Sequence, residues 1–126
     1  MPIQNKIDQL NHESDTWKRC LQFIQEENNN LKKRLSEVLQ VESGNEFLER
    51  AEYFQNEFLT EDNMVNILRY SIKELDDLAV REIFEDGAVI KELVRKQKKL
   101  NRDMEKTENH FSRLKSEFNN FLSDIL

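Results

Sequence analysis

The chain has 126 residues, of which 37% are hydrophobic and 35% are charged, and its net charge is −6 at pH 7. The hydrophobic share is lower and the charged share higher than in an average globular domain, which argues against the apolar core of a catalytic α/β domain. An acidic chain also lacks general attraction to nucleic acid or an anionic membrane, and its single cysteine excludes an internal disulfide framework. We therefore expect one cytoplasmic helical domain, without a secretory signal or a membrane-spanning segment.

The first third of the chain predicts a helix over about residues 3–42. Residues of its inward stripe recur at spacings of 3 and 4, like the a and d residues of a coiled coil, and are termed seam positions here. Pro2 suits the first turn of such a helix, but Ser14 and Asp15 could cap a later start, so the order of residues 1–14 stays open. The twelve seam positions, nine of them apolar, are Ile3, Ile7, Leu10, Ser14, Trp17, Leu21, Ile24, Asn28, Leu31, Leu35, Val38 and Glu42.

A second helix, over about residues 45–85, is expected after a turn at Gly44. Ser43 and Glu46 have the spacing of a capping box for its start. Thr60 and the acidic residues after it could begin a fresh helix and kink this one, but the seam spacing continues through them and predicts one helix. The ten seam positions, nine of them apolar, are Phe47, Ala51, Phe54, Phe58, Glu61, Val65, Leu68, Ile72, Leu75 and Ala79.

A third helix, over about residues 88–125, follows Gly87. Short connections favour antiparallel neighbours, and about 40 residues of helix span roughly 60 Å. The predicted fold is therefore all-α, an elongated antiparallel three-helix coiled coil or bundle with helices of about 40 residues. The eleven seam positions of the third helix, nine of them apolar, are Ile90, Leu93, Gln97, Leu100, Met104, Thr107, Phe111, Leu114, Phe118, Phe121 and Ile125.

The charges agree with antiparallel packing. Seven basic and three acidic residues lie between Lys91 and Lys106, whereas six acidic and one basic residue lie between Glu74 and Asp86. A reversal near Gly87 would set these two runs side by side, and a reversal near Gly44 would set Lys32, Lys33 and Arg34 against Glu49, Glu52 and Glu57. The alternative is that the basic run is a patch for phosphate or nucleic acid, although no aromatic residues interrupt it as nucleic-acid binding favours. Its candidate residues are Lys91, Arg95, Lys98, Lys99 and Arg102.

Residues that often carry chemistry form no known motif in this chain. His12 and His110 belong neither to an H-E-x-x-H zinc motif nor to the E-x-x-H pairs of di-iron bundles. Cys20 lies beside the seam, where it packs as a small hydrophobe, and its neighbours Lys18 and Arg19 favour a reactive thiol only weakly. Two isolated glycines do not build a phosphate-binding loop. We therefore expect neither enzymatic activity nor a metal or other cofactor.

Large side chains at seam positions are candidates for pairing or interaction. Phe54 and Phe58 should meet Phe111 and Phe118 at one end of the rod, as an aromatic core or, alternatively, as a cleft for an apolar ligand or a partner helix. Trp17 is large for a narrow seam and indicates either a wide part of the bundle or a subunit contact. The apolar stripe of the third helix is almost as narrow as that of a coiled coil, so we expect a second copy to supply part of its burial in a homodimer.

Asn28 is the most specific candidate for a pairing determinant. It occupies a seam position, whereas its neighbours Asn29 and Asn30 should face water. An asparagine at an a position fixes register and oligomeric state at some cost in stability. The sequence therefore predicts that Asn28→Leu raises the melting temperature and broadens the range of oligomers.

The segments TWKRCLQFIQEENNNLKKRLSEVL (16–39) and LERAEYFQNEFLTED (48–62) resemble parts of small uncharacterised coiled-coil proteins of bacteria, of the Bacteroidetes type. The outline is similar to that of spectrin-like three-helix units. These resemblances imply a helical fold, and they imply no activity and no functional residues. From the residues we expect a non-enzymatic helical scaffold or adaptor that acts through self-association and contacts with an unidentified protein. The alternative is a bundle that binds a small apolar or phosphate-bearing ligand.

Overall fold

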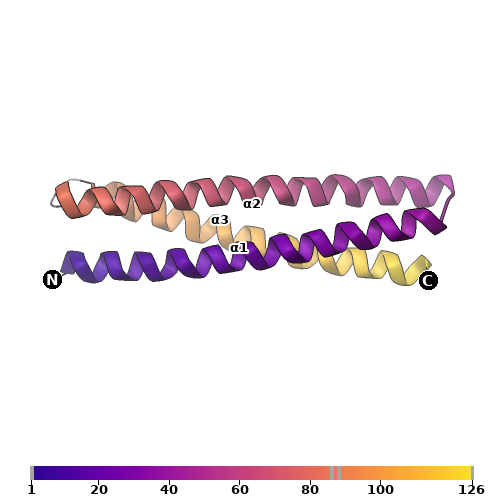
Figure 1. Ribbon diagram of the computed structural model, residues 1–126, viewed down its shortest axis with the longest axis horizontal. Coiled ribbons are helices and arrows are strands. Elements are labelled where there is room, and N and C mark those ends of the chain that lie inside the picture. Colours follow the sequence, from indigo (N-terminus) through magenta and orange to yellow (C-terminus); the bar gives the residue numbers. More distant parts are fainter. Residues whose placement is uncertain (1, 86, 88, 126) are drawn as a thin grey trace.

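The computed structural model describes residues 2–85, 87 and 89–125, and it consists of three long helices (Figure 1). Helix α1 spans Pro2–Val41, α2 spans Asn45–Glu85 and α3 spans Ile90–Ile125. The helices α1 and α3 run in the same direction and α2 runs in the opposite one, so the predicted elongated antiparallel three-helix bundle is confirmed. The predicted first residue of the third helix, residue 88, lies outside the described residues.

The seam positions form a core along the whole bundle. All three helices contribute fully buried side chains, among them Leu21, Phe58 and Leu93. α1 continues without a break through Ser14, so the alternative of a later helix start is wrong. α2 likewise continues through Thr60, whose hydroxyl donates to the carbonyl of Asn56 one turn earlier (3.0 Å). The prediction of one unbroken second helix is therefore correct.

The two connections depend on glycines with positive φ. Gly44 has φ 139° and its carbonyl accepts the first hydrogen bond of α2, from the amide of Leu48 (2.9 Å). Gly44 is therefore the N-cap residue, and the predicted capping box of Ser43 and Glu46 does not form. Gly87, with φ 92°, lies in the second connection. Both conformations are strained for residues with a Cβ atom.

The first turn of α3 is held by a carboxylate from α2. The Glu82 side chain is buried, and its Oε2 accepts a hydrogen bond from the amide of Val89 (3.0 Å), the residue before α3. Val89 in turn provides the carbonyl that accepts from the amide of Leu93 (3.0 Å). Glu82 therefore supplies a carboxylate acceptor at the start of α3, where Val89 has an apolar side chain.

The predicted aromatic core lies at the end of the rod where α2 begins and α3 ends. Phe54 packs against Phe118 and Phe121, with ring centroids 5.2 and 5.0 Å apart, and Phe58 lies 5.2 Å from Phe118. Phe47 stacks on Phe121 at 5.7 Å. Phe111 lies two turns before Phe118 in α3. It is buried in the core but does not join this ring cluster. The aromatic rings thus pack in the core of the bundle, while Phe54 and Phe58 also border shallow grooves on its surface.

Candidate functional site

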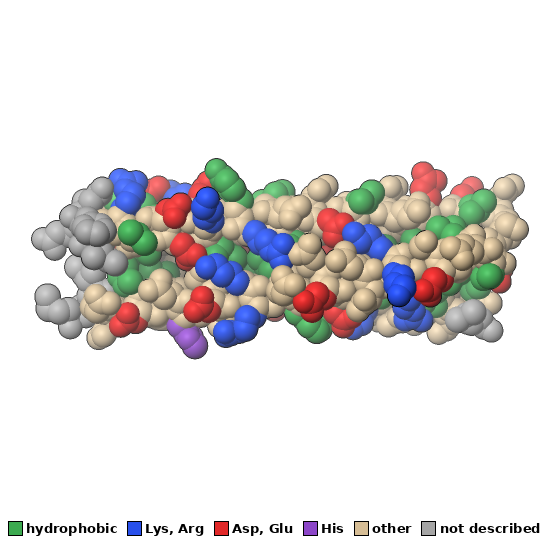
Figure 2. Space-filling view, viewed as in Figure 1, with side chains coloured by type: hydrophobic (Ala, Val, Ile, Leu, Met, Phe, Trp, Pro, Cys, Tyr) green, Lys and Arg blue, Asp and Glu red, His purple; other side chains and the backbone are tan. Residues whose placement is uncertain are grey.

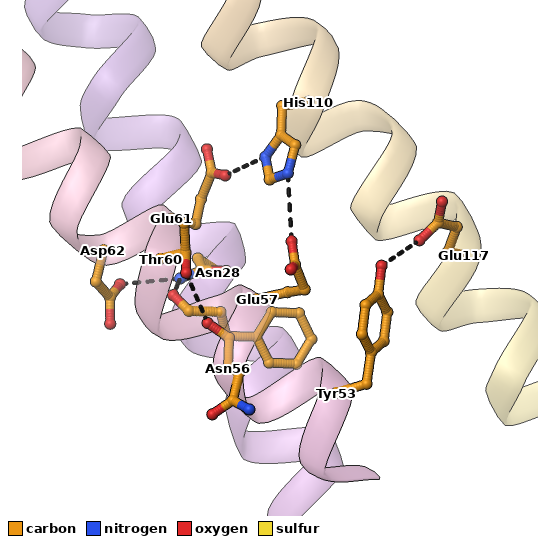
Figure 3. Close-up of polar contacts among 10 residues, drawn as sticks. Asn28, Tyr53, Asn56, Glu57, Thr60, Glu61, Asp62, His110 and Glu117 are labelled. Atoms are coloured by element: carbon orange, nitrogen blue, oxygen red, sulfur yellow. Dashed lines mark hydrogen bonds and ion pairs between the residues drawn. The ribbon is translucent and has the colours of Figure 1, made fainter. Parts of the chain in front are cut away.

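Buried polar side chains at the seam mark two places where α1 is fixed to α2. At the first, Asn28 is fully buried, and its Nδ2 donates to the carbonyl of Phe58 and to Oδ1 of Asp62, both at 2.9 Å (Figure 3). Lys32, one turn after Asn28, binds the other oxygen of Asp62. Asn28 therefore makes its contacts inside the chain, where it fixes the register of α1 against α2.

The same arrangement occurs two heptads earlier in α1 and two heptads later in α2. Ser14 is buried, and its hydroxyl donates to Oδ1 of Asp76 (2.7 Å), while Nζ of Lys18 lies 2.9 Å from Oδ2. The hydrogen bond to Asp76 raises the pKa of the Lys18 ammonium. Each of these polar clamps consists of a seam polar residue and a lysine of α1 that share one aspartate of α2. The repeat identifies one alignment of the two antiparallel helices.

A third polar group lies between α2 and α3. Nδ1 of His110 is 2.8 Å from Oε2 of Glu61, and Nε2 of the same ring is 3.3 Å from Oε2 of Glu57 (Figure 3). Glu61 is only 1% exposed, and its other oxygen has no hydrogen-bond partner among the described residues. Burial raises the pKa of the Glu61 carboxyl, and this effect exceeds the opposing contribution of His110. These three residues are termed the Glu–His–Glu cluster below.

Cys20 is half-buried at the contact of α1 with α3. Its thiol donates to Oε1 of Glu108 (3.0 Å). Burial, together with the nearby Glu108 carboxylate, raises the pKa of Cys20 to about 12. The thiol therefore stays protonated and unreactive at neutral pH, in agreement with the role of a packed small side chain.

The charge runs meet in a different way from the one predicted. Lys32 binds Asp62 rather than Glu49 or Glu52, because the heptad register places Asp62 on the side of α2 that faces α1. Glu57 lies on the opposite side and meets His110 of α3. Among the side chains that the structure describes, the basic run of α3 makes one ion pair with α2, between Lys96 and Glu74 (3.8 Å).

The five residues predicted as a basic face all project into solvent from α3: Lys91, Arg95, Lys98, Lys99 and Arg102. Arg95 and Lys99 pair with Glu92 and Asp103 of the same helix at 4.0 and 3.1 Å. In the described part of the chain, Lys91, Lys98 and Arg102 have no carboxylate within ion-pair distance. The described side chains of the acidic run of α2 therefore do not pair with these five residues; the side chain of Glu85 and the whole of Asp86 lie outside the described part.

The middle of α2 presents an outer surface without charge. Its exposed residues between 59 and 70 are here termed the uncharged face, and they are Leu59, Thr60, Asn63, Met64, Asn66, Ile67 and Tyr70. Leu59, Ile67 and Tyr70 are large side chains with 57%, 57% and 66% exposure. The charged residues of this stretch point elsewhere: Asp62 and Arg69 bind α1, and Glu61 is buried. Figure 2 shows side chains of both charges spread over one side of the rod, with hydrophobic side chains among them.

Shallow grooves lie on both sides of the uncharged face. Leu59 borders a groove of about 390 Å³ between α1 and α2, in which Leu35 and Leu39 also take part. Met64 and Thr60 border one of about 200 Å³ between α2 and α3, next to Glu61 and His110. The uncharged face is therefore continuous with apolar surface on either side.

The interaction candidates predicted from the sequence lie in three different environments. Trp17, Phe54, Phe58, Phe111 and Phe118 are buried in the core of a single chain. Asn28 is part of a polar clamp, and the basic face is exposed. Neither the uncharged face nor the Glu–His–Glu cluster was predicted from the sequence. The run of uncharged outer positions from Leu59 to Tyr70 can be read from the sequence once the seam positions are known.

In the described part of the chain, no helix is long and apolar enough to cross a membrane, and no group of three or more His, Cys, Asp or Glu residues is arranged to hold a metal ion. No protein-family model, curated protein or solved structure matches this chain.

Proposed function

We propose that this protein is a non-enzymatic helical scaffold that associates with itself and with other proteins through the uncharged face of α2. One observation carries the proposal: over three turns, the outer surface of α2 exposes large apolar side chains and no charged ones. This is unusual in a chain in which 35% of residues are charged. Contiguous exposed apolar surface on a folded chain indicates an interaction site, whereas isolated exposed apolar residues do not.

The position of the uncharged face favours a second copy of the chain as the occupant. The face is centred on the middle of α2, which spans Asn45–Glu85. Two copies that pair antiparallel about this centre would place Tyr70 of each against Leu59 of the other, and Asn63 against Asn66. Each chain has a net charge of −6. A contact surface without charged side chains brings no like charges together at the interface.

The ends of this contact add little to its affinity. In the same pairing, Glu52 of one copy would lie level with Asp77 of the other and Lys73 level with Asn56, so like charges face each other at both ends and weaken the contact. Three turns of one helix also bury less than the roughly 800 Å² per partner of a standard stable interface. We therefore expect a weak dimer that forms and separates with concentration, as suits a scaffold that also binds other proteins.

Sedimentation velocity over a wide micromolar range tests this proposal. We expect wild type to shift towards twice the 15.2 kDa mass of the chain as concentration rises. Ile67→Glu should stay monomeric with an unchanged helical spectrum, and Asn119→Glu is the matched control because it adds the same charge at an exposed position of α3. A wild-type chain that stays monomeric throughout would reject self-association and leave another protein as the occupant of the face.

The basic face supports a second candidate function, the binding of a phosphate-bearing ligand. The observation behind it is that Lys91, Lys98 and Arg102 remain exposed without a carboxylate partner in the described part of the chain. A thermal-shift panel of inorganic phosphate, nucleotides and anionic lipids tests it. Stabilisation that disappears in Lys98→Ala/Arg102→Ala supports this function, and no shift with any of the ligands rejects it.

A further inference from the structure

The Glu–His–Glu cluster has an unusual hydrogen-bond balance. His110 projects from α3 between two carboxyl groups that lie one turn apart on α2, and each ring nitrogen faces one carboxyl oxygen, at 2.8 Å for Glu61 and 3.3 Å for Glu57 (Figure 3). A carboxylate only accepts hydrogen bonds, whereas a neutral imidazole has one N–H donor and one bare nitrogen. With both glutamates ionised and the ring neutral, either the hydrogen bond to Glu61 or the ion-pair contact to Glu57 therefore sets a bare ring nitrogen against a carboxylate oxygen.

One additional proton removes this conflict. If the proton is on the ring, both nitrogens donate, and the imidazolium lies between two carboxylates. If it is on a carboxyl group instead, that group donates to the bare ring nitrogen. The contacts in the folded chain are thus all attractive only when the cluster holds one proton more than two ionised glutamates and a neutral histidine.

The surroundings make a missing proton costly. Glu61 is 1% exposed with one oxygen unpaired, and its α2 neighbours Glu57 and Asp62 add further negative charge. On α3, the cations nearest the grooves beside His110 are those of Lys106 and Arg113. On α1, Lys32 binds Asp62 and Glu27 accepts from Lys115, so neither of these two charges pairs with the cluster. A proton on the cluster would therefore compensate the charge of the buried Glu61 carboxyl directly.

We propose that Glu57, Glu61 and His110 form a proton-binding site between α2 and α3, and that the bound proton determines how firmly the middle of α3 packs on α2. A folded state that holds a proton which the unfolded chain releases loses stability as the pH rises. The raised pKa of Glu61 acts in the same direction: its contribution to stability is complete below the ordinary glutamate value of 4.5 and is lost as the pH rises through the folded-state value.

Denaturant unfolding from about pH 5 to about pH 8, in buffers with a chelator, tests the proposal on the full chain. Glu61→Gln keeps the shape of the side chain and needs no proton, because its amide donates to a bare ring nitrogen and its carbonyl accepts from a ring N–H. Glu52→Gln is the matched control, since it makes the same chemical change at an exposed position of α2.

We expect the wild-type unfolding constant to rise with pH relative to that of Glu61→Gln, by up to about tenfold per pH unit where the proton is released. Glu52→Gln should follow wild type. If Glu61→Gln does not fold, Glu57→Gln, which changes the more exposed carboxyl, should show the same flattening. Profiles for the glutamine variants of the cluster that run parallel to wild type would overturn the proposal.

Discussion

At the scale of single residues, the polar groups of the seam act within the chain. Asn28 has the position of a coiled-coil pairing residue, but both hydrogens of its amide bond α2 of the same chain, at the carbonyl of Phe58 and at Asp62. Its Oδ1 is buried without a partner among the described residues. Asn28 therefore fixes the register of α1 against α2, and its unpaired oxygen lowers the stability of the fold. A buried polar residue at an a position usually has both effects.

Asn28→Asp tests this position sharply. The change places a second carboxyl group within hydrogen-bond distance of Asp62 and removes a donor, so we expect a loss of roughly 2–4 kcal/mol of unfolding free energy at neutral pH. The loss should shrink near the ordinary Asp pKa of about 3.9, where one carboxyl takes up a proton. Asn29→Asp, at an exposed position next to it, is the control. Equal stability of the two variants at neutral pH would contradict the structure.

The thiol of Cys20 gives a second test at this scale. Its pKa of about 12, against an ordinary value of 9.0, lowers the thiolate fraction about a thousandfold at neutral pH. We expect slow reaction with a disulfide reagent in native buffer and fast reaction in denaturant, measured by absorbance. Similar rates in the two solutions would show that Cys20 is not held against Glu108.

At the scale of helices, the two polar clamps align α1 with α2. Asp76→Ala leaves the buried hydroxyl of Ser14 and the ammonium of Lys18 without their shared acceptor, so we expect a loss of roughly 1–3 kcal/mol in denaturant unfolding. Asp77→Ala, at the exposed neighbouring position, should stay within about 0.5 kcal/mol of wild type.

The two polar clamps lie roughly 21 Å apart along the helices, so the losses of stability caused by Asp62→Ala and Asp76→Ala should add in the double variant. A large deviation from additivity would show that the clamps are not independent.

The connection between α1 and α2 depends on the backbone of Gly44. No atom lies within 4 Å of the position that a Cβ would take, so a substitution there has room, but φ is 139°. We expect Gly44→Ala to cost roughly 1–2 kcal/mol through backbone strain alone. Ser43→Ala should be nearly neutral, because Ser43 does not cap α2. A thermal melt of both variants checks the difference, and a neutral Gly44→Ala would contradict this account of the turn.

The spacing of apolar residues predicted the three helices, their order and most of the core, because a period of 3 and 4 over five heptads has few structural solutions. It did not predict which flank of α2 faces which neighbour. That choice depends on the packing of all three helices, and it decides that Lys32 meets Asp62 and that Glu57 meets His110. The partners of single charges therefore required the structure, whereas the seam itself did not.

At the scale of the whole molecule, one chain buries most of the seam side chains that the structure describes and leaves two of its outer faces in solvent. The large seam side chains, Trp17 and Phe118 among them, lie in its own core. The uncharged face of α2 and the basic face of α3 remain in solvent. We propose that the first of these surfaces joins two copies of the rod in antiparallel orientation.

Dipolar EPR on spin-labelled cysteines tests this claim most directly, in a Cys20→Ser background with one label at Lys73→Cys or at Val80→Cys. In an antiparallel pair centred on the middle of α2, the distance between equivalent labels grows by about 3 Å per residue from the centre, which gives roughly 25 Å at position 73 and roughly 45 Å at position 80. We expect these two distances at concentrations where the dimer sediments. Similar short distances at both positions, or no dipolar coupling at either, would contradict the account.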